Sequence, residues 1–273
     1  MKIISRVIRI IKRDGLGWSF LRVVALFLRQ PLEVQRAKNK VWGALLKKYK
    51  YKVAHGPFKG MTLGENVWWS ANDRITQTLG IYEKHVLDML IDFSSKETTK
   101  FIDIGAADGY FAVGMAFGDY FRDVHAFEIS EEGQKHIKKN ALRNKCKDRV
   151  TAYGEANLAS LKGILNDEER AVVLIDIEGF EYDLLSLEML SLLKKCFLVC
   201  ELHPWMVECG NEKQEKLLRD ASEYFDLSLI KRETYNPNQF VELDEFTDEE
   251  RLIAVGEARR KNMNWLVLHP KNL

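Results

Sequence analysis

The segment FIDIGAADGYFA at residues 101–112 constrains the fold of this chain more than any other feature. A short apolar run contains Asp103, a turn with Gly105 and Gly109 follows it, and an apolar stretch typical of a buried helix begins directly after the turn. Glycine permits the positive φ angles of a tight turn, and the free N–H groups at a helix start can face a ligand. The segment therefore predicts a strand, a ligand-binding turn and a helix in direct succession.

Seven short apolar runs follow one another from residue 100 onward, and most have the continuous apolar character of strands that are covered on both faces. The runs are Phe101–Ile104, Val124–Phe127, Val150–Tyr153, Ala171–Ile175, Phe197–Cys200, Leu227–Ile230 and Trp265–Leu268. Helical segments separate the first five runs, which is the order of a doubly wound sheet. We therefore expect the α/β class, with a doubly wound, mostly parallel, seven-stranded Rossmann-like sheet and helices on both faces. A Thr-Asp-Glu-Glu capping box at 247–250 predicts a helix before the last strand.

Basic residues concentrate at the N-terminal end of the chain. Residues 1–60 carry 15 Lys and Arg against 2 Asp and Glu, which leaves 41 − 15 = 26 basic and 40 − 2 = 38 acidic residues for the remainder. Residues 16–28 form an apolar stretch that is interrupted by Arg22, and this stretch is shorter than the about 20 residues of a membrane-spanning helix. No signal-peptide cleavage site follows it, so we expect the arm to stay attached and the protein to be cytoplasmic.

The four cysteines, Cys146, Cys196, Cys200 and Cys209, contain no C-x-x-C pair and no zinc-like spacing with histidine. A disulfide framework and a structural zinc site are therefore not expected, and the cysteine usage favours a reducing compartment.

Acidic residues stand at the ends of the first three predicted strands. Asp103 lies within the first strand, Glu128 follows the second strand nineteen residues after Gly109, and Glu155 follows the third. In a doubly wound fold, the acid after the second strand accepts both hydroxyls of a ribose. An acid after the third strand can accept a hydrogen bond from an adenine amino group. The pattern thus predicts an adenosine-containing cofactor.

The turn also separates two classes of cofactor. A nicotinamide dinucleotide requires Gly-x-Gly-x-x-Gly, but Ala107 and Tyr110 occupy the second and third glycine positions here. An Asp-x-Gly-x-x-x-Gly turn suits a cofactor that has no phosphate and carries a positively charged amino-acid tail. S-adenosylmethionine fits this description.

Four stretches of the sequence together resemble the FkbM-type methyltransferases of the class I S-adenosylmethionine-dependent superfamily. They are FIDIGAADGYFA at 101–112, HAFEIS at 125–130, LIDIEGFEYDLL at 174–185 and VCELHP at 199–204. The resemblance covers residues 79–204 and extends loosely to 265–270. It implies a Rossmann-like methyltransferase sheet, S-adenosylmethionine as the cofactor, and methyl transfer to oxygen of a sugar, a lipid-linked glycan or a polyketide-like acceptor. The basic arm and residues 232–262 depart from the family pattern, and we expect them to bear on acceptor choice.

The residues expected to bind the cofactor combine the turn, the acids at the strand ends and, by the resemblance alone, Glu83. They are Glu83, Asp103, Gly105, Ala106, Ala107, Gly109, Glu128, Ile129, Glu155, Ala156 and Asp176. Trp68 and Trp69 are candidates to line an acceptor pocket or to close the core, since aromatic faces suit both roles.

The candidate reaction centre lies where two further strands end. Asp176 and Glu178 follow the strand at 171–175, while Glu201 and His203 end the strand after it. His203 is the predicted base for the acceptor hydroxyl, because its ordinary pKa of about 6.5 suits this role. Asp176 is expected to position the acceptor or the amino group of the cofactor. Glu178 and Glu201 are expected to orient or polarise the groups around them. Glu181 is expected to be either a solvated charge or a charge at a helix N-terminus, where the helix dipole favours it.

No metal is predicted, but oxygen-rich ligand sets suit magnesium-like ions, so a divalent metal remains an alternative. Its ligands would be Asp176, Glu201 and His203. Two other functions also remain open. One is a nicotinamide-dependent oxidoreductase, and the other is a non-catalytic, membrane-associated scaffold that binds the cofactor.

The expected organisation is a basic amphipathic helical arm over residues 1–50, a lead-in segment over 51–98 and the S-adenosylmethionine-binding domain over 99–273. Residues 1–40 carry apolar residues at helical spacing among Lys and Arg. This pattern favours docking on an anionic membrane surface, at the inner face of the membrane. The alternative is a helical cap on the acidic body or a dimer contact. No nucleic-acid partner is expected, since the arm lacks interleaved aromatic residues and the body is acidic.

Overall fold

The computed structural model of the chain describes residues 32–65, 73–94, 98–165, 170–257, 259, 261 and 263–271. Most of the predicted basic arm, residues 1–31, lies outside these ranges, as do Trp68 and Trp69. Among the helices within the described ranges, none combines the length and the apolarity that a membrane span requires.

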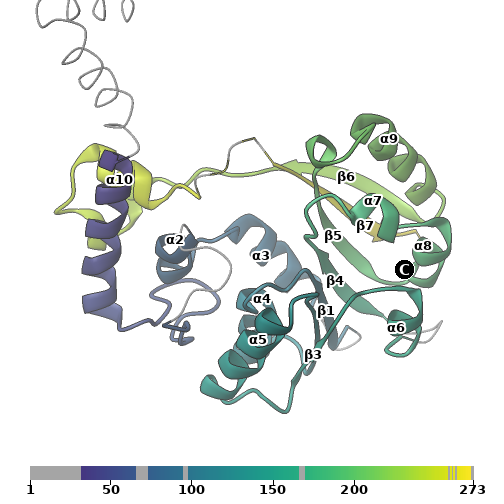
Figure 1. Cartoon of the computed structure of the whole chain (residues 1–273), viewed down its shortest axis with the longest axis horizontal. Helices are drawn as coiled ribbons and strands as arrows, with labels where there is room; N and C mark the ends of the chain where they lie inside the picture. Colours follow the sequence, from purple (N-terminus) through teal and green to yellow (C-terminus); the bar gives the residue numbers. More distant parts are fainter. Residues whose placement is uncertain are drawn as a thin grey trace, which may run out of the picture.

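A single seven-stranded sheet forms the centre of the molecule (Figure 1). Its strands are β1 (Lys100–Ile104), β2 (Asp123–Phe127), β3 (Val150–Tyr153), β4 (Ala171–Ile175), β5 (Phe197–Leu202), β6 (Phe225–Lys231) and β7 (Asn264–Pro270). They lie in the order β3-β2-β1-β4-β5-β7-β6, and β7 alone of these strands runs antiparallel to both of its neighbours. All seven predicted strands are present, so the predicted mostly parallel, doubly wound sheet is confirmed.

The strand register brings the predicted site elements to one edge of the sheet. Ile104 at the end of β1 pairs with Phe127 at the end of β2 and with Ile175 at the end of β4. The residues that follow these strands therefore meet at the carboxyl edge. The chain order reverses between β1 and β4, and this reversal is the position where doubly wound sheets bind ligands.

Helices cover both faces of the sheet because successive side chains of a strand point to opposite sides (Figure 1). One face packs against α3 (Lys84–Asp92), α4 (Tyr110–Phe117) and α5 (Glu131–Arg143). The other face packs against α6 (Leu158–Lys162), α8 (Leu187–Leu192) and α9 (Gly210–Ala221), while the short α7 (Glu181–Leu184) follows β4. In β1, Phe101 belongs to the first core, whereas Ile102 and Ile104 belong to the second.

A third, smaller core joins the N-terminal part of the chain to the connection between β6 and β7. The helix over 32–49 contributes Val41 and Leu45, and α2 (Arg74–Leu79) contributes Ile75 and Leu79. The connection contributes η3 (Pro237–Gln239), η4 (Val241–Leu243) and α10 (Asp248–Ala254), with Leu243 and Ala254 fully buried. Figure 1 shows α10 beside the N-terminal helix, away from the sheet.

The predicted capping box is confirmed in this region. It opens α10, because the Thr247 side chain accepts from the Glu250 backbone and the Glu250 side chain from the Thr247 backbone. The described residues of the lead-in segment hold a bridge between Lys52 and Thr62 and also the helix α2, which was not predicted.

Candidate functional site

The turn after β1 is wound tightly enough to require glycine. Gly105, Ala107 and Gly109 have φ angles of 89°, 49° and 84°. A Cβ atom on Gly105 would lie 1.8 Å from the carbonyl oxygen of Asp176, so only glycine fits there. The turn therefore packs its backbone directly against the end of β4. Gly109 begins α4, and a Cβ there would lie 3.2 Å from Cγ1 of Ile137 in α5.

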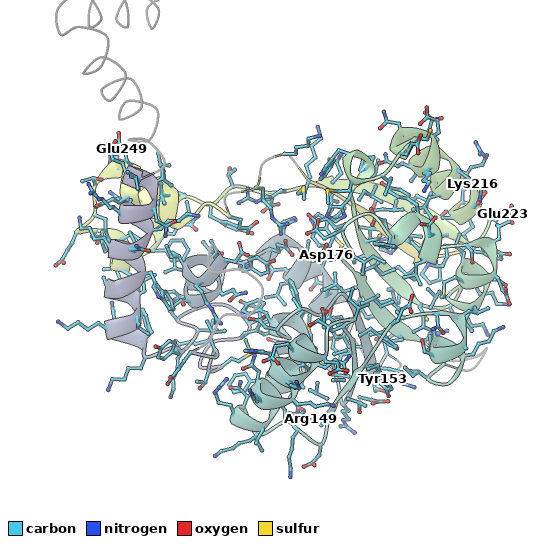
Figure 2. All side chains as sticks on the ribbon, in the orientation of Figure 1. Arg149, Tyr153, Asp176, Lys216, Glu223 and Glu249 are labelled. Carbon is cyan, nitrogen blue, oxygen red and sulfur yellow. The ribbon has the colours of Figure 1, made fainter. Side chains whose placement is uncertain are left out.

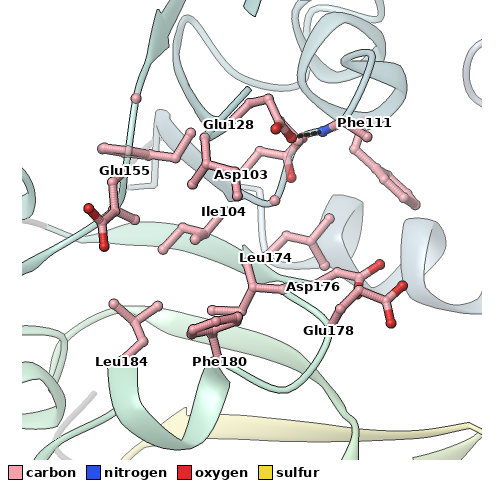
Figure 3. A pocket seen from close by; sticks show the side chains of 18 of the residues that line it. Asp103, Ile104, Phe111, Glu128, Glu155, Leu174, Asp176, Glu178, Phe180 and Leu184 are labelled. Atoms are coloured by element: carbon pink, nitrogen blue, oxygen red, sulfur yellow. Dashed lines mark hydrogen bonds between the residues drawn. The ribbon is translucent and has the colours of Figure 1, made fainter. Parts of the chain in front are cut away.

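A cavity of about 870 Å³ opens at this edge of the sheet (Figure 3). Its charged lining residues are all acidic: Asp73, Glu83, Asp103, Asp108, Glu128, Glu155, Asp176, Glu178, Asp183 and Glu188. Among the described residues that line it, none is Lys, Arg or His. The cavity is therefore suited to a cationic ligand.

Different residues line opposite sides of the cavity. Figure 3 shows Glu155 on one side and Asp176 with Glu178 on the other, with Asp103 and Glu128 along the wall between them. Apolar side chains supply much of the remaining surface, and two of them are strongly exposed: Ile129 at 80% and Phe180 at 70%. Exposed apolar side chains at the edge of a cavity provide flat contact area for a ring system.

Glu128 is held by backbone groups on both sides. Its Oε2 atom accepts from the N–H of Ala107 at 3.1 Å, and its Oε1 atom accepts from the N–H of Ser130 at 2.8 Å. A carboxylate oxygen has two lone pairs, so each oxygen keeps one acceptor position for a ligand hydroxyl. The arrangement fixes Glu128 against the turn, as recognition of a ribose requires.

Asp103 is buried beneath the turn, with 3% of the residue exposed. Its Oδ2 atom accepts from the N–H of Ala112 in the first turn of α4 at 3.1 Å. Burial, helped by the carboxylates of Asp176 and Glu128, raises the pKa of Asp103 to about 7 against the lowering effect of the Ala112 hydrogen bond. A positively charged ligand group would favour the ionised form.

Of the other predicted cofactor residues, Gly105, Ala106, Ala107, Ile129, Glu155 and Ala156 line the cavity, whereas Gly109 does not. Glu83 also lines it and is 2% exposed. The backbone N–H of Glu83 donates to Glu257 at 3.0 Å, and its carboxylate pairs with Arg259. Arg232 completes this network at 2.9 Å from Glu257.

Sequence reasoning did not identify Arg232, Glu257 or Arg259 as site residues. All three belong to the connection between β6 and β7, which was predicted only to bear on acceptor choice. None of them follows a strand of the parallel part of the sheet, and no motif surrounds them. Arg259 also lies 3.6 Å from Glu201, so one guanidinium joins this connection to two acids of the site region.

Asp176, Glu178, Glu201 and His203 lie close together, as their positions at the ends of β4 and β5 predict. The Nε2 atom of His203 lies 3.5 Å from Glu178, 3.7 Å from Asp176 and 3.8 Å from Glu201. Only Asp176 and Glu178 line the cavity, since the side chains of His203 and Glu201 are fully buried. Figure 2 places Asp176 near the middle of the molecule, far from the peripheral Lys216 and Glu249.

Burial shifts the titration of this cluster. It raises the pKa of Asp176 to about 6, although His203 opposes the shift. It also raises the pKa of Glu201 well above its usual range, with Asp176 adding to the effect. Burial alone would lower the pKa of His203, but contact with Glu181 and the neighbouring carboxylates outweigh burial and raise it.

Glu181 is a charge at a helix N-terminus but not a solvated one. It stands in the first turn of α7, and its side chain is fully buried. Its carboxylate accepts from the N–H of Gly179 at 2.8 Å and from the N–H of His203 at 2.7 Å. The alternative of a solvated charge is therefore wrong, because these two donors hold the carboxylate inside and tie the ends of β4 and β5 together.

The described residues contain one group that could hold a metal ion, and it differs from the ligand set considered above. Asp176, Glu178 and His203 each offer a ligand atom within 4.8 Å of the others. Glu201 is not part of this group. Its Oε1 atom lies 3.6 Å from Arg259, and its Oε2 atom lies 3.8 Å from Nε2 of His203.

No family model matches the sequence, and the search of curated proteins also finds no match. Solved structures share the fold at low identity. The tRNA methyltransferase TrmK of B. subtilis is 12% identical with a TM-score of 0.44, and the alignment covers 67% of this chain and 64% of TrmK. The ribosomal protein L11 methylase of Lactobacillus delbrueckii subsp. bulgaricus is 16% identical with a TM-score of 0.47, covering 78% of this chain and 86% of that one.

A third structure, TYW2 of M. jannaschii in complex with AdoMet, is 15% identical with a TM-score of 0.44, and the alignment covers 74% of this chain and 77% of TYW2. This chain thus spans less than two thirds of the length of TrmK and more of the other two. Similarity at this level assigns neither a reaction nor an acceptor to this chain, and the FkbM-type resemblance stays a prediction.

Proposed function

We propose that this chain is an S-adenosylmethionine-dependent methyltransferase, similar to the FkbM type, that methylates a hydroxyl oxygen. The acceptor we propose is a sugar, a glycan or glycolipid, or another small molecule. The observation that carries the proposal is the cavity at the switch point of the sheet, whose charged lining residues within the described ranges are acidic only.

The lining residues fit this cofactor group by group. Glu128 has free acceptor positions for the two ribose hydroxyls, and Glu155 lies on the side of the cavity where an adenine amino group would donate. Asp103, Glu83 and Asp176 supply negative charge for the amino-acid end. When bound, S-adenosylmethionine supplies an electrophilic methyl group on a positively charged sulfur.

A nicotinamide dinucleotide fits the same residues poorly. Its pyrophosphate would have to use the N–H groups at the start of α4. The carboxylate of Asp103 already accepts the Ala112 N–H there. A pyrophosphate would therefore lie beside a carboxylate, with no basic residue among the described lining residues to compensate.

Asp176 and Glu178 are the residues we propose to contact the acceptor. They line the cavity on the side opposite Glu155, and both face the Nε2 atom of His203. The acceptor proton passes to one of these carboxylates. His203, the predicted base, lies on the side of the carboxylates that faces away from the cavity, and its Nε2 atom accepts the proton from them. Glu201 and Glu181 orient this cluster from the buried side.

Cofactor binding is tested by calorimetry with S-adenosylmethionine, S-adenosylhomocysteine and NAD on the full chain. We expect the first two to bind and NAD not to bind. Glu128→Ala removes charge-assisted hydrogen bonds of about 1.5–3 kcal/mol each, so binding should weaken tenfold or more with the melting temperature unchanged. Glu132→Ala, a half-exposed acid of α5 outside the cavity, is the control. Unchanged affinity in Glu128→Ala, or preference for NAD, would overturn the cofactor assignment.

The acceptor class is tested by transfer of tritium from methyl-labelled S-adenosylmethionine into fractionated cell extract. We expect label in the sugar, glycolipid or small-molecule fraction. Label in RNA or protein would contradict the proposed acceptor class while supporting methyl transfer. Cofactor binding without label in any fraction would favour the non-catalytic scaffold.

A further inference from the structure

The side chains of Asp176, Glu178 and His203 direct ligand atoms at one another without a cation among them. His203 Nε2 faces Glu178 Oε2 at 3.5 Å and Asp176 Oδ1 at 3.7 Å. The His203 side chain is fully buried. Its Nδ1 atom faces Glu181 at 3.4 Å, whereas its Nε2 atom has no hydrogen-bond partner. Asp176 Oδ1 also lacks one. Buried polar atoms in native proteins have partners, so these atoms point to a ligand between them.

We propose that Asp176, Glu178 and His203 bind a divalent transition-metal ion, and that this ion holds the acceptor hydroxyl during methyl transfer. Binding of the ion stands on these three residues alone. Its role in the reaction rests on the proposed function.

The two distances from His203 Nε2 to the carboxylate ligand atoms are compatible with a tetrahedral ion. Metal–ligand bonds of about 2.1 Å in tetrahedral geometry place neighbouring ligand atoms about 3.4 Å apart. The two measured distances from His203 Nε2, 3.5 and 3.7 Å, are close to this value. Imidazole together with carboxylate favours zinc-like ions over magnesium, which prefers oxygen ligands only. Three protein ligands leave the fourth position open, as in catalytic rather than structural sites.

Glu181 supports the site from the opposite side of the imidazole ring. Its Oε1 atom lies 3.4 Å from Nδ1 of His203 and accepts the backbone N–H of the same residue at 2.7 Å. A histidine that binds a metal through one nitrogen commonly donates its other N–H to a carboxylate, which fixes the tautomer. The buried Glu181 is therefore a positioning residue that presents the Nε2 lone pair to the ion.

The open position faces the cavity, because Asp176 and Glu178 line it and His203 lies behind them. An acceptor hydroxyl bound there would lose its proton more readily, as metal-bound water does. With Nε2 of His203 bound to the ion, His203 could not take the proton, which would pass instead to the second carboxylate oxygen of Glu178, a side chain that is 43% exposed. The acceptor oxygen then forms its bond to the methyl carbon while the carbon–sulfur bond breaks, leaving a neutral thioether.

The test is metal binding by the full chain after dialysis against a chelator, in the absence of cofactor and acceptor. Co²⁺ serves as a spectroscopic probe, since its visible absorption distinguishes tetrahedral from octahedral coordination, and calorimetry with Zn²⁺ and Mg²⁺ measures affinity and stoichiometry. We expect one tetrahedral Co²⁺ per chain and tighter binding of Zn²⁺ than of Mg²⁺. Glu178→Gln, a change at a half-exposed side chain, should weaken Zn²⁺ binding at least tenfold. Asp183→Asn removes an exposed carboxylate that lines the same cavity, and should leave binding unchanged.

Stoichiometric binding lost in Glu178→Gln and kept in Asp183→Asn supports the site. Absence of binding by the wild-type chain, equal binding by both variants, or octahedral Co²⁺ overturns it. S-adenosylmethionine binding, measured on the same dialysed samples, reports on the proposed function separately. A chain that binds the cofactor but not the metal loses only the cation site, and one that binds the metal but not the cofactor loses only the proposed function.

Discussion

Asp103 couples cofactor binding to pH. Its pKa is raised to about 7 by burial, with Asp176 and Glu128 as the facing charges, so much of the free protein holds this carboxyl protonated below pH 7. A cationic ligand binds the ionised form better. We therefore predict that the affinity for S-adenosylmethionine rises from pH 6 to pH 8, up to about tenfold, and levels off above pH 8. Calorimetry at several pH values measures this change.

The variant Asp103→Asn separates this residue from the other acids of the site. The raised pKa means that the folded chain binds a proton that the unfolded chain has lost, so Asp103 lowers stability as the pH rises from about 4 to about 7. We expect Asp103→Asn to remove that part of the pH dependence of the free energy of unfolding, along with most of the pH dependence of binding. Asp183→Asn, on the same cavity, should change neither. A parallel pH profile in wild type and Asp103→Asn would contradict the assignment.

His203 should affect turnover and leave cofactor binding nearly intact. It contacts Asp176 and Glu178 but is not among the cavity-lining residues. We predict that His203→Ala lowers turnover about 10²–10⁴-fold, the size of a lost general base, with cofactor affinity changed less than twofold. Steady-state kinetics and calorimetry on the same variant measure both quantities.

The structural alternative for His203 is a cap at the end of β5, in which case stability and activity would fall together. A melting curve distinguishes the two. The control is His269→Ala, which removes an exposed histidine of β7 outside the cavity and should leave turnover and cofactor binding unchanged.

The predicted site residues that the structure brings together share one property, which is their position at or just after the carboxyl end of a strand. Asp103, Glu128 and Asp176 are brought together by the parallel register alone, which β-strand periodicity and element order determine. Glu181 also lies shortly after a strand, in the segment that follows β4. Its burial, however, depends on the hydrogen bond that it accepts from the N–H of His203, after the next strand. Sequence periodicity carries no information on such a contact, so it could not exclude a solvated charge at this position.

At the scale of elements, the connection between β6 and β7 places Arg259 among buried acids. It pairs with Glu83 and lies 3.6 Å from Glu201 and 3.8 Å from Glu257. Removing one partner of a buried pair leaves uncompensated charge and costs about 3–5 kcal/mol. We predict that Arg259→Ala lowers the melting temperature by several degrees. S-adenosylmethionine, whose ammonium can pair with Glu83, should raise the melting temperature of this variant more than that of wild type.

Lys261→Ala is the matched control for Arg259→Ala, because it removes a positive charge two residues away. Lys261 lies over the ring of Trp205, 5.1 Å from its centroid, where its contact contributes on the order of 1 kcal/mol or less. Thermal melts with and without cofactor compare the two variants. Equal small effects would mean that Arg259 has no structural role in the site.

The seven strands were predictable from the sequence, whereas the structure of the connection between β6 and β7 was not. Most of the strands are continuous apolar runs bounded by polar segments, as β4 with its five buried residues illustrates, although β6 also contains polar residues. The connection holds short 3₁₀ turns and one helix, and it is ordered by packing on the helix over 32–49 through residues such as Phe240 and Leu243. Only the capping box at Thr247 marks this region in the sequence, since the rest depends on contacts with residues about 200 positions away.

At the scale of the whole molecule, the N-terminal end consists of two segments with different expected roles. The helix over 32–49 buries Val41 and Leu45 against the connection between β6 and β7, and Lys40 pairs with Glu250 at 2.8 Å. This part of the predicted arm therefore belongs to the folded body. Residues 1–31 carry seven Lys and Arg against one acid, and they remain the part we propose to dock on an anionic membrane surface.

Two truncations separate these roles. Removing residues 1–31 deletes seven basic residues that each contribute about 1 kcal/mol near an anionic surface, so co-sedimentation with anionic liposomes should be lost. Cofactor affinity and melting temperature should not change. Removing residues 1–49 also deletes Val41 and Leu45, which exposes the third core and should lower the melting temperature by several degrees. Neutral liposomes and high salt are the controls, because the attraction is screened by salt. If the full chain fails to sediment at low salt, or if removing residues 1–31 alone destabilises the protein, residues 1–31 are structural and the membrane proposal is wrong.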